Sequence, residues 1–355
     1  MLTSRQKTLR KFWYAVMPVH RLNDGPKPFK LMGEDIVLFL DAEGKPAALK
    51  DRCCHRTAKL SKGWCDAGRI VCGYHGWTYD REGKVVRIPQ AGNDDLKTRF
   101  ATPSYHCQER YGYAWVALDQ PIAPIFDIPE DGDPSFRRIF QFYDQWRTSP
   151  LRLMENSFDN AHFSFVHKAT FGQIDKPRPQ RYELVETDYG FYAASTVEVL
   201  NPPEAHRVTG DTSPVTTRKM ANHWYMPFSR RMDMEYPSGL RHIIINCATP
   251  IDDGNIQLVQ LLYRNDTEKD CATQTLIDWD GKITMEDKEV LESTDPDACV
   301  DLSRKAEAHM ASDQPGMIMR RRLLALLREH GEEEIFNSPP ADAPSANQSS
   351  NIAAL

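Results

Sequence analysis

The sequence predicts an α+β protein of two domains, in which a β-rich N-terminal domain precedes an antiparallel sheet flanked by helices. Three observations support this prediction. Short β-rich runs alternate with glycine-bearing turns in the first third, a proline-rich acidic connection occupies 120–135, and longer helical and strand-like patterns follow. We therefore place the domains at 1–125 and 126–336, and we expect 337–355, rich in Pro, Ser, Ala and Asn, to be a disordered tail.

Each element follows from a local pattern. In the first domain, the β-rich runs 36–40 and 84–86 adjoin the turn sequences 41–44 and 80–83, which is typical of hairpins. The second domain is expected to contain, in chain order, a helix over 151–167, strands over 190–200, 241–249 and 256–263, a helical stretch near Met285, and a last helix over 317–330 that ends at a left-handed cap on Gly331.

Composition excludes several classes of protein. The 44 Lys and Arg are outnumbered by 50 Asp and Glu, so the net charge of -6 offers no basic surface for nucleic acid. No apolar run approaches the ~18 residues of a membrane span, and the N-terminus lacks the apolar core of a signal peptide. We therefore expect a cytoplasmic protein with no membrane partner. Eight cysteines are too few for a disulfide framework, and four of them fall between Cys53 and Cys72, which favours metal binding or redox chemistry.

Those cysteines belong to the first candidate metal centre. Cys53, His55, Cys72 and His75 form the pattern C-x-H-x16-C-x2-H, and each half lies between strand-like runs, so two loops can converge. Two thiolates and two imidazoles suit either a tetrahedral zinc ion or a [2Fe-2S] cluster with cysteines on one iron and histidines on the other.

The residues around these ligands resemble a known motif. The segments 53–56 (CCHR) and 72–77 (CGYHGW) resemble the Rieske motif of non-haem iron oxygenases, which implies a Rieske [2Fe-2S] cluster on Cys53, His55, Cys72 and His75. Respiratory Rieske proteins add a bridging cysteine pair. Ala58 and Gly73-Tyr74 occupy those places here, so no bridging disulfide is expected. We expect the two remaining cysteines of this region, Cys54 and Cys65, to be small buried residues.

A second candidate centre follows in the second domain. Asn156, Asp159, His162 and His167 are spaced N-x2-D-x2-H-x4-H. On a straight helix the first three share a face, whereas the two histidines diverge by roughly 140°. If both histidines bind one ion, the helix must therefore end or deform between them.

This spacing resembles the iron-binding motif of the same oxygenases. The resemblance implies that His162, His167 and a distant carboxylate hold one mononuclear Fe(II) with open positions for O2. Asp287 is the candidate carboxylate, and its neighbour Glu286 is the rival. The resemblance also implies that Asp159 orients an iron histidine and links it to the cluster of a neighbouring chain, and that Asn156 lies beside the iron.

The implied protein is the oxygenase component of a Rieske monooxygenase, similar to the vanillate and dicamba O-demethylases and the caffeine N-demethylases, with a helix-grip (START-like) catalytic domain. It would hydroxylate or oxidatively demethylate a small, aromatic substrate. The chain lacks a G-x-G-x-x-G fingerprint, so NAD(P)H electrons would come from a separate reductase or ferredoxin, and the family implies a homotrimer. The alternatives are ring cis-dihydroxylation, a Rieske electron-transfer protein and a zinc-stabilised binding protein. We expect Arg230-Arg231 to be a solvated pair and assign no substrate from it.

Overall fold

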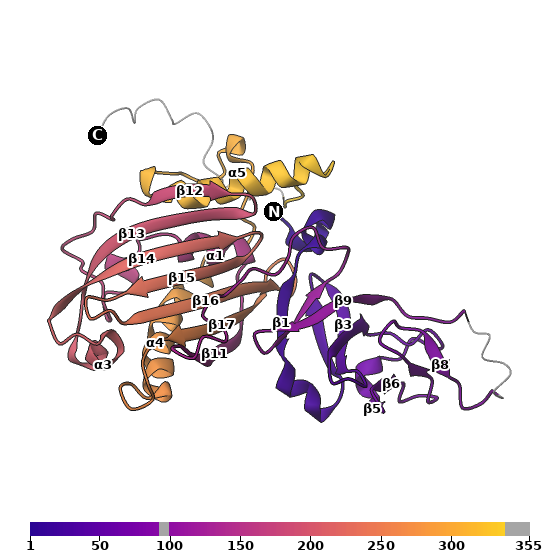
Figure 1. Ribbon diagram of the computed structural model, residues 1–355. Coiled ribbons are helices and arrows are strands. Elements are labelled where there is room, and N and C mark those ends of the chain that lie inside the picture. Colours follow the sequence, from indigo (N-terminus) through magenta and orange to yellow (C-terminus); the bar gives the residue numbers. More distant parts are fainter. Residues whose placement is uncertain (92–98, 338–355) are drawn as a thin grey trace.

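The computed structural model describes residues 1–91 and 99–337, and Figure 1 shows a β-rich domain from the first third of the chain beside a larger sheet packed against helices. This is the predicted α+β class. No helix within the described ranges combines the length and apolar character needed to cross a bilayer.

The first domain, as far as the structure describes it, contains two antiparallel sheets. The larger has the order β1-β10-β9-β4-β3-β2 and the smaller the order β5-β6-β7-β8. The predicted hairpins are confirmed as β3-β4 and β7-β8. The strands are β1 (Tyr14–Pro18), β2 (Lys27–Leu31), β3 (Glu34–Leu40), β4 (Pro46–Lys50), β5 (Trp64–Asp66), β6 (Arg69–Val71), β7 (Thr78–Tyr79), β8 (Val85–Arg87), β9 (Ser104–Arg110) and β10 (Tyr113–Ala117).

The connection at 120–135 contains no regular element and separates β10 from the first strand of the second sheet. That sheet has the order β11-β17-β16-β15-β14-β13-β12, and every neighbouring pair is antiparallel. Its strands are β11 (Arg137–Trp146), β12 (Glu183–Thr187), β13 (Gly190–Leu200), β14 (Val215–Tyr225), β15 (Ser229–Glu235), β16 (Arg241–Pro250) and β17 (Ile256–Arg264). The predicted strands at 190–200, 241–249 and 256–263 are confirmed as β13, β16 and β17.

Helices α1, α2 and α4 lie on one face of this sheet, and α5 runs beside its β12 edge (Figure 1). The α-helices are α1 (Pro150–Ser157), α2 (Phe163–Val166), α3 (His206–Thr209), α4 (Thr273–Leu291) and α5 (Gln314–Glu329). Short 3₁₀ helices cover Thr3–Arg5, Lys7–Lys11, Val19–Asp24, Leu60–Lys62, Pro203–Ala205, Leu302–Arg304 and Ala311–Asp313. Gly331 follows α5 with φ 72°, so the predicted left-handed cap is confirmed.

The predicted continuous helix over 151–167 is wrong. Helix α1 ends at Ser157, and only the single turn of α2 lies between His162 and His167. Ser149 caps the start of α1, where its side chain accepts from the backbone N–H of Arg152. Asp159 then bonds the backbone N–H of Ala161, an alternative to the helical ladder that favours a turn at this place.

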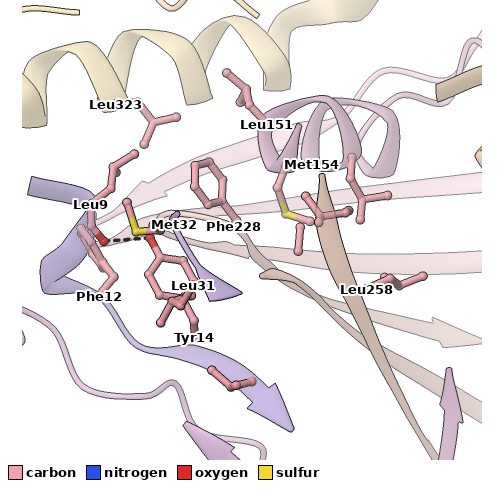
Figure 2. Close-up of a cluster of buried hydrophobic side chains, with 14 of the residues drawn as sticks. Leu9, Phe12, Tyr14, Leu31, Met32, Leu151, Met154, Phe228, Leu258 and Leu323 are labelled. Carbon is pink, nitrogen blue, oxygen red and sulfur yellow. Dashed lines mark hydrogen bonds between the residues drawn. The ribbon is translucent and has the colours of Figure 1, made fainter. Parts of the chain in front are cut away.

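One hydrophobic core joins the two domains. Figure 2 shows Leu9, Phe12 and Tyr14 from the N-terminal segment facing Met154 of α1 and Leu323 of α5. The Tyr14 hydroxyl donates to the carbonyl of Leu9, which satisfies its polar end inside the core. The domain ranges 1–125 and 126–336 therefore remain our proposal, for two units that pack against each other through a common hydrophobic core. Apart from Asn337, the predicted disordered tail lies outside the described residues.

Candidate metal centres and the active-site cavity

Two loops with matching hydrogen bonds carry the first set of ligands. Cys53 and His55 lie after β4, and Cys72 and His75 lie between β6 and β7. The N–H of Cys53 bonds the carbonyl of Ala58, and its carbonyl accepts from Thr57. Cys72 makes the same two bonds, with the carbonyl of Trp77 and the N–H of Gly76. The same pair of backbone hydrogen bonds therefore holds each Cys-to-His segment in a tight turn.

The fourth residue after each cysteine has left-handed backbone. Gly76 has φ 73°, which glycine adopts at little cost. Thr57 has φ 59°, a strained conformation for a β-branched residue, and it donates the matching N–H to Cys53. Such strain is retained where surrounding structure or function requires it.

The side chains fit a [2Fe-2S] cluster. Both Cys53 and Cys72 are buried, and the ring centroids of His55 and His75 are 4.6 Å apart. His55 stacks on Trp77 at 4.5 Å, and its buried Nδ1 has no hydrogen-bond partner within the described residues. Desolvation, then the nearby His75 and Arg56, lowers the pKa of His55, which favours the neutral imidazole that a metal requires.

All eight cysteines are free thiols, including those of the two loops. The expectation that Cys54 is buried is wrong, because its side chain is exposed at the surface of the first loop. Cys65 is half-buried on β5. The exposure of Cys54 follows from the arc of the loop, which turns Cys53 inward and the next residue outward.

Tyr79 is a residue of this centre that the sequence patterns did not indicate. Its hydroxyl lies 3.0 Å from Sγ of Cys53 and 3.3 Å from Sγ of Cys54, and it accepts from the backbone N–H of Cys54. Burial, then the hydrogen bonds with the two cysteines, raises the pKa of Tyr79. The phenol therefore stays protonated and can donate to a Cys53 thiolate.

We expect Tyr79→Phe to lower the reduction potential of the cluster by about 50 mV, because a hydrogen bond to a ligand sulfur favours the more negative, reduced state. A redox titration followed by EPR measures this shift. Tyr74→Phe is the control, since the Tyr74 side chain is 66% exposed and its hydroxyl makes no hydrogen bond within the described residues. An unchanged potential in Tyr79→Phe would contradict the assignment.

The second centre brings together His162, His167 and Asp287 from distant parts of the chain. One ligand atom of each lies within 4.8 Å of the others. The Nε2 atoms of the two histidines face each other at 3.1 Å, and Oδ1 of Asp287 is 3.5 Å and 3.3 Å from them. His162 precedes α2 and His167 follows it, so one helical turn between two irregular positions turns both rings to the same side. This donor set fits an iron facial triad.

Glu286 and Asp287 contribute differently to this centre. Oε2 of Glu286 lies 2.8 Å from Nδ1 of His167 and accepts from the Thr170 hydroxyl at 2.9 Å. Glu286 therefore fixes the far side of the His167 ring, and Asp287 faces its Nε2. Burial raises the pKa of Asp287, but His167, His162 and Asn156 outweigh it and lower the pKa, so Asp287 stays a carboxylate.

The other two predicted residues lie against the same group. Nδ2 of Asn156 donates to Oδ1 of Asp287 at 3.3 Å. Oδ2 of Asp159 lies 3.4 Å from Nδ1 of His162, without the alignment of a hydrogen bond, so that this buried nitrogen has no hydrogen-bond partner within the described residues. Asn156 thus contacts the carboxylate and Asp159 adjoins the ring of His162.

A cavity of about 100 Å³ opens beside these residues, between α1, α2 and α4 and the inner face of β14, β15, β16 and β17. His162, His167 and Asp287 form part of its wall. The expectation of a solvated Arg230-Arg231 pair is wrong, because both side chains are buried. Arg230 lines the cavity, whereas Arg231 faces the other side of β15 and pairs with Glu130 at 2.8 Å. Alternation along a strand separates the two.

Two family models together match most of the chain. Residues 12–106 match the Rieske [2Fe-2S] domain, and residues 146–329 match the vanillate O-demethylase oxygenase C-terminal domain.

Individual relatives belong to the same group of oxygenases. Methylxanthine N1-demethylase NdmA of Pseudomonas putida is 28% identical, with 96% of both chains covered. The vanillate O-demethylase oxygenase subunit of a Pseudomonas species is 27% identical over 79% of this chain and 84% of the relative. A solved structure of the QL mutant of P. putida NdmA with theobromine has a TM-score of 0.77 at 25% identity, covering 95% of this chain and 99% of that one. Dicamba monooxygenase, at 20% identity and a TM-score of 0.77 over 91% of this chain and 98% of that chain, shares the fold.

Proposed function

Since the chain belongs to the Rieske oxygenases whose catalytic domain is of the vanillate O-demethylase type, we propose that it removes a methyl group oxidatively from a small aromatic substrate, or hydroxylates it. The observation that carries this proposal is the meeting of His162, His167 and Asp287 at the wall of a cavity. An electron-transfer protein would need neither that triad nor that cavity.

In this proposal each centre is held by residues already described. Cys53, His55, Cys72 and His75 hold the [2Fe-2S] cluster, and His162, His167 and Asp287 hold one mononuclear iron. When bound, the cluster supplies electrons and the ferrous iron supplies the site at which O2 is activated beside the substrate.

The surrounding side chains position these ligands. Glu286 bonds Nδ1 of His167 and accepts from the Thr170 hydroxyl, while Asn156 donates to the Asp287 carboxylate. The sheet residues and the aromatic side chains Trp146, Phe163 and Trp279 line the cavity and limit the space that water can occupy. Chemistry is then confined to a substrate seated against this wall.

The proposed demethylation balances with one O2, two electrons and two protons. One oxygen atom is inserted into a methyl C–H bond and the other leaves as water. The hydroxymethyl product then loses formaldehyde as its C–O or C–N bond breaks, and its hydroxyl proton passes to the oxygen or nitrogen of the demethylated product. The test is turnover with a surrogate NAD(P)H reductase under ¹⁸O2. Formaldehyde with one labelled oxygen supports demethylation, a ring diol with two labelled atoms supports cis-dihydroxylation, and cluster reoxidation without product in a broad screen of methylated aromatics contradicts both.

We further propose that a separate reductase or ferredoxin serves this cytoplasmic protein, and that three copies assemble head to tail, so that Asp159 of one chain connects His162 to a cluster histidine of its neighbour. The position of Asp159 beside His162 supports this arrangement.

We expect Asp159→Asn to leave cluster reduction unchanged but to slow cluster reoxidation by substrate and O2 at least tenfold. Single-turnover spectroscopy measures this rate, and light scattering measures the assembly. Asp175→Asn, on an exposed loop, is the control. A monomer with full activity would exclude the intersubunit route.

A further inference from the structure

The cavity beside the proposed iron residues contains two guanidinium groups. Arg218 of β14 and Arg230 of β15 both line it, at 6% and 8% exposure. Neither has an ion pair with any residue in the described part of the chain. A buried charge without a counter-ion is costly, so its retention requires a reason beyond folding.

Arg218 has the fewest partners of its own. Its side chain makes no hydrogen bond within the described residues, and its Nε is fully buried. Its guanidinium carbon lies 4.4 Å from the ring centroid of Phe171, and that ring stacks on His167 at 4.6 Å. One aromatic ring therefore separates this cation from a proposed iron ligand.

Asp280 also lines the cavity, but its carboxylate bonds other groups. Oδ2 of Asp280 accepts from His242 at 3.1 Å and from Gln141 at 2.5 Å. His242 in turn faces Arg264 at 2.8 Å through Nδ1, and Arg264 pairs with Asp266. Asp266 also pairs with Arg137 at 2.8 Å, and within the described residues no carboxylate of this network forms an ion pair with Arg218.

The second cation, Arg230, likewise forms no ion pair within the described residues, although the charge of the nearby Asp287 acts on it. Nε and Nη2 of Arg230 donate to Oδ1 of Asn222 at 3.2 Å and 3.0 Å. Its guanidinium lies 5.4 Å from the ring of Phe158. Burial lowers the pKa of Arg230 to about 10, so that it still carries its charge at neutral pH.

We propose that the cavity selects a small aromatic carboxylic acid, with Arg218 as the main carboxylate-binding residue and Arg230 as the second cation. A planar guanidinium matches a carboxylate with two parallel hydrogen bonds. The aromatic walls and the cavity of about 100 Å³ suit a single ring, which separates this preference from the two-ring methylxanthines in the relatives' names. The substrate class rests on the proposed function, but the binding preference can be tested without turnover.

The test is calorimetry on the anaerobic holoprotein without reductase, using 4-methoxybenzoate and the neutral isostere 4-methoxybenzamide. We expect the acid to bind at least about tenfold more tightly than the amide. Arg218→Met should weaken the acid about tenfold or more and leave the amide unchanged, and Arg218→Lys should restore part of the loss. Equal affinities, no acid binding at millimolar concentration, or an Arg218→Met protein with unchanged acid affinity would overturn the proposal.

Thermal unfolding separates this role from a structural one. Arg218→Met should keep or raise Tm, because it removes an unpaired buried charge. The matched variant Arg264→Met should lower Tm, because it removes a fully buried arginine that is ion-paired with Asp266 and hydrogen-bonded to the carbonyl of Val208. A lower Tm in Arg218→Met would instead assign Arg218 to folding. These binding and unfolding measurements use neither oxygen nor a reductase. Their results would therefore still stand if the protein failed to oxygenate any substrate.

Discussion

A His162→Ala protein is expected to lose the mononuclear iron and all measurable oxygenation while keeping the spectrum of its cluster. The wild type should contain about three iron atoms and two acid-labile sulfides per chain, and the variant about two of each. The reason is geometric, because Nε2 of His162 is one of the three ligand atoms that converge here within the described residues, and the remaining pair is a weak site. Metal and sulfide analysis with visible and EPR spectra on anaerobically purified protein measures both quantities.

His330→Ala is the matched control, because His330 is exposed just after α5 and should retain about three iron atoms. The comparison separates the alternatives left open by the sequence. Two iron atoms in wild type and variant alike would indicate an electron carrier. Zinc without sulfide in the wild type would indicate a zinc-stabilised protein and exclude the oxygenase.

The second large effect concerns the helices behind the iron residues. Arg320 of α5 is 3% exposed and donates to both carboxylate oxygens of Glu155 at the end of α1, to Glu307 and to the carbonyl of Cys299. We expect Arg320→Met to lower the free energy of unfolding by about 3–5 kcal/mol, because two carboxylates lose their shared buried cation. Denaturant unfolding measures the change. Arg321→Met removes a 59% exposed arginine from the same helix and should cost less than about 1 kcal/mol; equal effects would contradict a special role for Arg320.

The same network predicts how stability depends on pH. Burial raises the pKa of Glu307, but hydrogen bonds and charges from Arg152 and Arg320 outweigh it and lower the pKa from 4.5 to about 2. A lowered folded pKa contributes stability above the unfolded pKa and loses it as pH falls toward the folded value. The difference in unfolding free energy between wild type and Glu307→Gln should therefore shrink between about pH 5 and about pH 2. A difference independent of pH would show that Glu307 acts only through packing.

Sequence patterns did not predict β14 and β15, because residues on these strands line a polar cavity. The inward residues of β14 include Thr216, Arg218 and Asn222, so that its buried face has a polar sequence. On β15, Arg230 and Arg231 are both buried because the cavity lies on one side and the Glu130 ion pair on the other. Alternation of apolar and polar residues fails where both faces are covered and one lines a polar site.

The sequence by itself determined the features that are local. The spacing of Cys53, His55, Cys72 and His75 defines two short loops, and the order of hairpins, linker, strands and final helix follows from nearby turns and periodicity. It also narrowed the distant iron carboxylate to Glu286 or Asp287.

Only the tertiary structure decided which of these two faces the histidine pair. Adjacent helical residues point about 100° apart, so the packing of α4 against the 162–170 segment directs Asp287 to both Nε2 atoms and Glu286 to the opposite side of His167. The unpaired state of Arg218 was equally invisible in the sequence, because the absence of a counter-ion depends on every chain segment that surrounds the cavity. The spacing of neighbouring residues therefore predicts which side chains can bind a metal. Which distant side chains meet, and whether a buried charge has a partner, depends on contacts between segments that can lie more than a hundred residues apart.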